Sequence, residues 1–157
     1  MNPILKSFFC LSLFLYSVLS LAQYKLTDPL PVDPEVKMGK LTNGLSYYIR
    51  KNSKPEKKVE RRLVVNAGSV LENDNQQGLA HFMEHMGFNG SKNFPKNELV
   101  DYLQKTGVKF GADLNAYTGF DETVYILPVP TEDPAVVEKA FTILEDWAFN
   151  NLFDKNE

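Results

Sequence analysis

Apolar and polar residues are arranged along this chain in a pattern that predicts both strands and helices. Residues 52–58 are polar and lie between two short runs rich in aromatic and β-branched side chains, which indicates a hairpin. A second pair of such runs flanks Gly119, and we expect these two to pair with each other. The four predicted strands cover residues 45–50, 59–66, 108–118 and 122–127.

Two segments have the 3.6-residue spacing and the end signals of core helices. Pro95 suits a first helical turn and Gly107 a C-terminal cap, which predicts a helix over residues 95–106. A second helix begins at Pro134 and continues toward the end of the chain. The residues that we expect these two helices to bury are Leu99, Leu103, Val136, Val137, Ala140, Ile143, Leu144 and Trp147.

The segment from Gln77 to Gly87 contains both histidines of the sequence. As a helix it places His81 and His85 one turn above each other, with Glu84 between them in angle. The opposite stripe is apolar, and we expect it to face the core. It consists of Leu79, Phe82, Met83 and Met86.

Two imidazoles one turn apart, with a carboxylate beside them, are typical of a hydrolytic zinc site. Neutral histidines bind Zn²⁺ at about 2.0–2.1 Å, and a third protein ligand and a water complete such a site. The metal lowers the pKa of its water toward about 7, and a carboxylate can accept the proton. The pattern is H-x-x-E-H, the inverted metallopeptidase signature. We therefore predict that His81 and His85 bind zinc and that Glu84 is the general base. The alternative is an ordinary amphipathic helix with two histidines on its polar face.

Two stretches together resemble a known family. Residues 78–91, and then Asn115-Ala-Tyr-Thr118 with residues 120–125, are similar to the N-terminal catalytic domain of the M16 (pitrilysin/insulinase-like) zinc metallopeptidases. The similarity extends from about Met38 to Glu157. It implies an α+β fold, a largely antiparallel sheet with helices packed on one face. The periodicity by itself supports only the mixture of helices and strands.

The resemblance also implies a role for the strand at residue 115. In M16 enzymes the matching strand lines the cleft and binds an extended peptide by backbone pairing, so Asn115, Ala116 and Thr118 are candidate substrate contacts. The alternative is a strand that ends in a tight turn, with Asn115 making only local hydrogen bonds.

A catalytic zinc site needs one protein ligand more than the two histidines. The family places it as a glutamate in a helix that follows the segment ending near Phe153, so we expect it beyond Glu157. Glu138 and Glu145 are substitutes within the chain, but their spacing favours the solvated side of the last helix. The chain is therefore expected to be the N-terminal part of a larger peptidase, or a truncated copy of one, without the rest of its first half and without the second, homologous half.

The first residues resemble a secretory signal peptide. Lys6 precedes an apolar run, and Ser20 and Ala22 supply the small residues of a cleavage site, so residues 1–22 are predicted leader. A retained N-terminal anchor is the alternative. Residues 23–37 contain three prolines and predict an extended lead-in, and residues 38–157 the peptidase domain. This leader predicts export to the bacterial periplasm or outside the cell, with no stable membrane anchor.

Charge and cysteine content narrow the chemistry further. The one cysteine, Cys10, lies in the predicted leader, so a metal must use histidine and carboxylate ligands. Without Lys6, 16 of the 17 Lys and Arg remain against 20 Asp and Glu, a net charge of −4 that gives no reason to expect nucleic acid. Seven basic residues in 50–62 form either a patch for acidic lipid or substrate, or a solvated turn.

Three functions remain open at this point. The first is a zinc metalloendopeptidase that acts on peptide or protein substrates. The second is a non-catalytic peptide-binding or scaffold subunit, as some M16 relatives are implied to be. The third is a structural or storage zinc module, which the absence of cysteine disfavours because closed zinc sites use four protein ligands.

Overall fold

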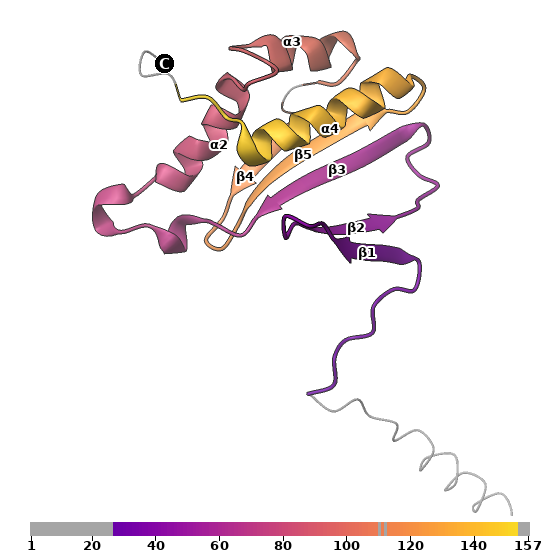
Figure 1. The fold of residues 1–157 in the computed structure, drawn as a ribbon, viewed down its shortest axis with the longest axis horizontal. Helices are drawn as coiled ribbons and strands as arrows, with labels where there is room; N and C mark the ends of the chain where they lie inside the picture. Colours follow the sequence, from indigo (N-terminus) through magenta and orange to yellow (C-terminus); the bar gives the residue numbers. More distant parts are fainter. Residues whose placement is uncertain (1–26, 110, 112, 154–157) are drawn as a thin grey trace, which may run out of the picture. The chain divides into compact units, whose positions relative to one another are not determined.

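The structure is a computed structural model that describes residues 27–109, 111 and 113–153 (Figure 1). The chain divides into two compact units that meet in sequence at Lys51 and Asn52. The predicted leader lies outside the described residues, as does the start of the lead-in. The predicted domain limits stay a prediction.

The first unit contains a hairpin that the sequence analysis missed. Strand β1 (Val36–Lys40) pairs antiparallel with β2 (Ser46–Arg50), in the register Val36↔Arg50. Its turn includes Gly44 at φ +94°, and Asn43 Oδ1 accepts a hydrogen bond from Leu45 N at 3.1 Å. The Asn-Gly pair is a hairpin signal. The strand at 46–50 was therefore predicted correctly, but its partner lies before it in the chain.

The second unit is built on a three-stranded antiparallel sheet in the order β3-β5-β4. These strands are β3 (Lys58–Val65), β4 (Asn115–Thr118) and β5 (Thr123–Pro130). The hairpin predicted between residues 45–50 and 59–66 is not formed in the described sheets: residues 46–50 pair with β1, and β3 pairs with β5 over its whole length. The predicted pair around Gly119 is confirmed, with Thr118 opposite Thr123. Its first strand begins only at Asn115.

The described part of this unit has three helices: α2 (Leu79–Asn89), α3 (Glu98–Lys105) and α4 (Pro134–Phe149), with short 3₁₀ turns η1 (Ser69–Leu71) and η2 (Asp74–Gln76). Helix α4 lies along one face of the sheet (Figure 1). It begins where Asp133 accepts a hydrogen bond from Ala135 N at 2.8 Å, an N-cap with proline in the first turn. The core between helices and sheet includes Leu99, Leu103, Tyr125, Leu127, Val129, Val136, Ala140, Ile143 and Trp147.

This arrangement confirms the α+β class with a largely antiparallel sheet. The helix predicted over residues 95–106 begins later, at Glu98, because Lys96 has φ +52° and Asn97 is its N-cap. Its end is as expected, since Gly107 follows the last turn at φ +86°. None of the helices within residues 27–153 that the structure describes is long and apolar enough to cross a membrane.

The basic residues around β3 have acidic or aromatic neighbours. Lys57 pairs with Glu132 at 2.7 Å, and Arg62 pairs with Glu60 at 2.7 Å. Arg61 lies 4.5 Å from the ring centre of Phe141 on α4. These contacts favour the solvated turn over a patch for an acidic ligand.

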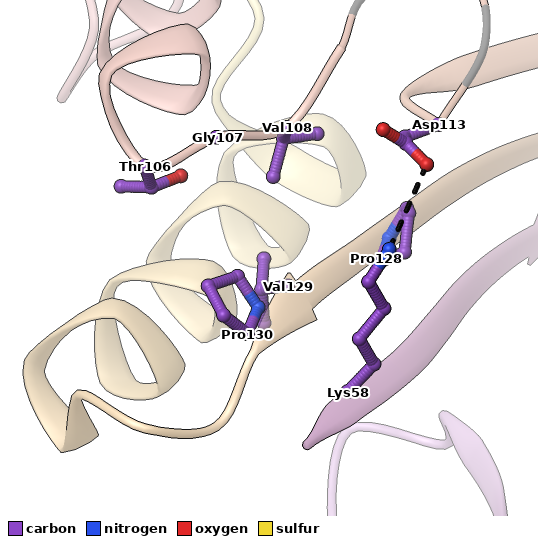
Figure 2. Close-up of a pocket in the computed structure, with 8 residues that line it drawn as sticks. All are labelled: Lys58, Thr106, Gly107, Val108, Asp113, Pro128, Val129 and Pro130. Carbon is purple, nitrogen blue, oxygen red and sulfur yellow. Dashed lines mark ion pairs between the residues drawn. The ribbon is translucent and has the colours of Figure 1, made fainter. Parts of the chain in front are cut away.

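A small hollow lies where β3 begins and β5 ends (Figure 2). Lys58 and Asp113 approach to 4.0 Å across it. Its remaining lining residues are Thr106, Gly107, Val108, Pro128, Val129 and Pro130. Since Pro130 is seven residues along β5 from Thr123, the hollow lies about 23 Å from the strand end beside Thr118. The candidate metal centre lies at that other end.

Candidate metal centre

Helix α2 is fixed at its N-terminus by a carboxylate that sequence reasoning missed. Glu72 accepts hydrogen bonds from Gly78 N and from Ala80 N, both at 2.8 Å. Gly78 has φ +89°, a conformation that glycine adopts without strain. The carboxylate satisfies amides that a helix start leaves without partners and suits the positive end of its dipole. The sequence signal was an acidic residue a few positions before a predicted helix.

The two histidines meet as the helical spacing predicted. His81 Nε2 and His85 Nε2 lie 3.1 Å apart, and the ring centroids are 4.7 Å apart at a tilt of 59°. Two bonds of about 2.05 Å to one tetrahedral zinc ion would place their nitrogens about 3.3 Å apart. Both side chains are exposed. The donor set therefore fits two of the ligands of a zinc ion.

Glu84 occupies the buried edge of the same helix. Its side chain is only 8% exposed, and Thr118 Oγ1 on β4 donates a hydrogen bond to its Oε2 at 2.6 Å. Nearby, burial raises the pKa of Tyr125 to about 12, and the charge of Glu84 adds to this shift. The Tyr125 hydroxyl donates to Met83 O at 3.4 Å.

The apolar stripe predicted for the core side of α2 is largely wrong. Leu79, Phe82 and Met83 are 46%, 54% and 38% exposed, and only Met86 of that set is buried. The side that contacts β4 and β5 instead carries Glu84 and Gly87. A Cβ on Gly87 would lie 2.7 Å from the Tyr125 ring, so only glycine permits this close approach. Close packing and a buried carboxylate selected a different face from the one that hydrophobicity indicated.

The C-terminal end of α2 is tied to α4 by a buried network. Trp147 Nε1 donates to Gly87 O at 2.8 Å. Asp146 is fully buried and accepts from Ser91 Oγ at 2.6 Å, from Asn93 N and Nδ2 at 2.9 and 2.8 Å, and from Asn150 Nδ2 at 3.0 Å. Burial acts to raise the pKa of Asp146, but these hydrogen bonds outweigh it and leave the pKa below its ordinary value.

Neither in-chain alternative for the third ligand forms a metal-binding group with the two histidines in the part of the chain that the structure describes. Glu138 and Glu145 are both exposed on α4, as the helical spacing predicted. Among the residues that the structure describes, no group of three histidine, cysteine, aspartate or glutamate side chains could hold a metal. A third ligand beyond Glu157 stays a prediction.

The candidate substrate strand lies next to the motif helix. In the described sheet β4 is an edge strand, with β5 as its neighbour on one side, and it contacts α2. Asn115 is exposed, and its Oδ1 accepts a hydrogen bond from Ala116 N at 2.9 Å, the local contact considered as an alternative. The Thr118 side chain is directed to Glu84. Substrate contacts by Asn115, Ala116 and Thr118 stay predictions.

Comparisons with known proteins agree with this geometry. The insulinase family model, peptidase family M16, matches residues 47–157. The chain belongs to this family. It is 43% identical over 145 residues to the probable zinc protease PqqL of Haemophilus influenzae, a match that covers 91% of this chain and 16% of that protein. The resemblance inferred from the two motifs is confirmed.

Solved M16 structures share the fold. The first half of the periplasmic protease PqqL from Escherichia coli matches with a TM-score of 0.78 at 40% identity, covering 82% of this chain and 27% of that one. The ferredoxin protease FusC, in complex with Arabidopsis ferredoxin, matches with a TM-score of 0.65 at 32% identity, covering 78% of this chain and 13% of that one. The chain thus spans less than a third of each of these relatives.

Proposed function

We propose that this chain carries the zinc-binding motif and the general base of an exported M16 metalloendopeptidase, and that the active enzyme is longer than these 157 residues. The observation that carries the proposal is that the Nε2 atoms of His81 and His85 lie 3.1 Å apart on helix α2. The same helix carries the buried carboxylate of Glu84. The names of relatives as probable zinc proteases support it.

Each residue of the motif then has a separate task. His81 and His85 provide two zinc ligands through Nε2. A bound zinc ion supplies the Lewis acidity that makes a water nucleophilic near neutral pH and polarises a peptide carbonyl. Glu84 accepts the proton of the attacking water and returns it to the leaving amine. Its burial beside β4 keeps the carboxylate from turning into bulk water.

Strand β4 is the proposed substrate platform. An edge strand has backbone N–H and C=O groups that can pair with an extended peptide whatever its side chains are. Asn115 and Ala116 would orient the peptide beside the histidines. The ferredoxin protease FusC is a relative that was solved in complex with a protein, ferredoxin, and we infer a peptide or protein substrate here as well.

The same relatives support the proposed location and the proposed further segments of the enzyme. PqqL of E. coli is named a periplasmic protease, which supports the periplasmic location predicted from residues 1–22. The low coverage of these relatives supports a third zinc ligand, and a second M16-like half, in segments outside this chain.

The test is Glu84→Gln in the full protein that contains this chain. We expect bound zinc to remain at one equivalent, while peptide cleavage falls by at least ~100-fold, because a general base contributes about 10²–10⁴-fold. Zinc content by mass spectrometry of the intact protein and cleavage of a quenched peptide measure the two quantities. Unchanged turnover would contradict the proposal. Metal-independent peptide binding without turnover in the unsubstituted protein would support a scaffold subunit instead.

A further inference from the structure

The hydrogen bond between β4 and the motif helix concerns the oxygen of Glu84 that faces the sheet. Thr118 Oγ1 lies 2.6 Å from Glu84 Oε2, the length of a strong bond between a hydroxyl and a carboxylate. Among the hydrogen bonds that the structure gives for the described residues, this is the one made by the Glu84 side chain. The carboxylate is nearly buried, so losing this donor would not be compensated by bulk water.

The hydroxyl of Thr118 is itself fixed by the sheet. Thr118 is opposite Thr123 in the β4–β5 ladder, and its β-branched side chain has few allowed rotamers. Thr123 Oγ1 lies 3.5 Å from Thr118 Oγ1 but donates its single proton to Ala67 O, which is closer at 2.9 Å. Thr118 therefore keeps its own proton for Glu84.

We propose that Thr118 is a positioning residue for the general base. Its hydroxyl binds Oε2 and sets the rotation of the carboxylate, so that Oε1 is the oxygen that accepts the proton of the attacking water. This inference rests on the proposed function. It assigns the Thr118 side chain to the base, whereas the sequence motif suggested a contact with substrate.

The position of Thr118 also links substrate binding to the base. The residue ends the strand whose other end, at Asn115 and Ala116, is the proposed peptide platform. A peptide that pairs with β4 would thus order the strand that orients Glu84. Because the hydroxyl contacts Glu84 and not the peptide, losing it should lower kcat rather than raise KM.

The experiment compares Thr118→Val, Thr118→Ser and Thr123→Val in the full protein that contains this chain, with peptide cleavage and zinc content as readouts. Thr123→Val is the matched control, because it removes a hydroxyl from the opposite residue of the same ladder without touching Glu84. We expect Thr118→Val to lower kcat about 10- to 100-fold, with KM and zinc content within about twofold. Thr118→Ser should restore kcat to within about threefold of the unsubstituted protein, and Thr123→Val should stay within the same range.

Other results would overturn the inference. A kcat unchanged in Thr118→Val, or a loss of equal size in Thr123→Val, would mean that the hydroxyl has only a structural role. A rise in KM alone would mean that it contacts substrate. If Thr118→Val does not fold, a comparison of Thr118→Ala with Thr118→Ser decides in the same way. Equal activities of these two variants would exclude a positioning role for the hydroxyl. Failure of the proposed function is recognised separately, because Glu84→Gln would then retain turnover.

Discussion

Two carboxylates, Glu72 and Asp146, determine at the residue scale how the ends of α2 are placed. Glu72 caps the N-terminal amides, and Asp146 binds the segment that follows the C-terminal end. Neither residue touches the histidines. Both act by restraining the helix on which the two ring nitrogens must stay about 3 Å apart.

Replacing Glu72 by alanine tests the N-terminal restraint. The change leaves two amides at the helix start without their charged acceptor, and we expect the free energy of unfolding to fall by about 1–2 kcal/mol. Urea denaturation followed by circular dichroism measures it. Glu145→Ala removes an exposed glutamate from α4 and should change stability by less than about 0.5 kcal/mol. Equal effects of the two substitutions would contradict a capping role.

Ionisation of the buried Asp146 should make the free energy of unfolding depend on pH. Its pKa is lower in the folded chain than its ordinary value of about 3.9, so its ionised form stabilises the fold above that pH. This contribution is lost as pH falls through the lower, folded pKa. Asp146→Asn presents an amide to the donors of Asn93 and should cost about 2–4 kcal/mol at pH 7.

The difference between the unsubstituted chain and Asp146→Asn should therefore shrink as the pH is lowered from 5 toward 2. Urea denaturation at each pH measures this difference. Ser91→Ala keeps the charge, removes one of the four donors and should cost about 1 kcal/mol with little change between pH 7 and 5. A gap between the unsubstituted chain and Asp146→Asn that is constant down to pH 2 would show that the carboxylate titrates normally.

At the scale of elements, the centre depends on contacts between segments far apart in the chain. The 3₁₀ turn η1, which precedes α2, rests on the β4–β5 turn: Ser69 N donates to Gly119 O at 3.1 Å, and Val70 N to Phe120 O at 3.0 Å. A Cβ on Gly68 would lie 2.5 Å from the backbone oxygens of both Gly119 and Phe120. Backbone atoms cannot rotate away as a side chain can, so glycine is required at Gly68.

Gly68→Ala should accordingly destabilise the chain by about 1–3 kcal/mol, the usual cost of overpacking. Gly119→Ala in the facing turn is the control. A Cβ there would lie at an ordinary 3.6 Å from Glu122 O, and the change should stay within about 0.5 kcal/mol. Thermal unfolding of the two variants compares them, and a tolerated Gly68→Ala would mean that the two turns separate easily.

At the scale of the whole molecule, large apolar side chains are exposed around the candidate metal centre. Leu79, Phe82 and Met83 on α2 are exposed beside the histidines, and Val70, Leu71 and Phe120 are exposed on the adjoining turns. A contiguous patch of large exposed apolar side chains marks a surface that binds a partner, a ligand or a further segment of the protein. The low coverage of the M16 relatives agrees with a centre that further segments complete.

A zinc titration separates a complete centre from an incomplete one. Residues 23–157 alone should bind zinc weakly, because two imidazoles are short of the three protein ligands of a catalytic site. A longer segment of the protein that continues past Glu157 should bind much more tightly, and His81→Ala should abolish binding in both. Isothermal calorimetry measures the affinities. Tight one-to-one binding by residues 23–157 would instead mean that this chain itself supplies the third ligand.

The sequence by itself determined the features that depend on neighbours within one or two turns. The four-residue spacing of His81 and His85, the start of α4 at Pro134 and the β4–β5 turn are local, because helix period and turn geometry act over a few residues. The family also followed from two short motifs. The tertiary structure decided what depends on distant partners: that β3 pairs with β5, that α2 buries Glu84 instead of Leu79 and Phe82, and that the Thr118 hydroxyl binds Glu84. Strand partners and buried faces are chosen by competition among all segments, and a linear pattern has no information on which segment packs best.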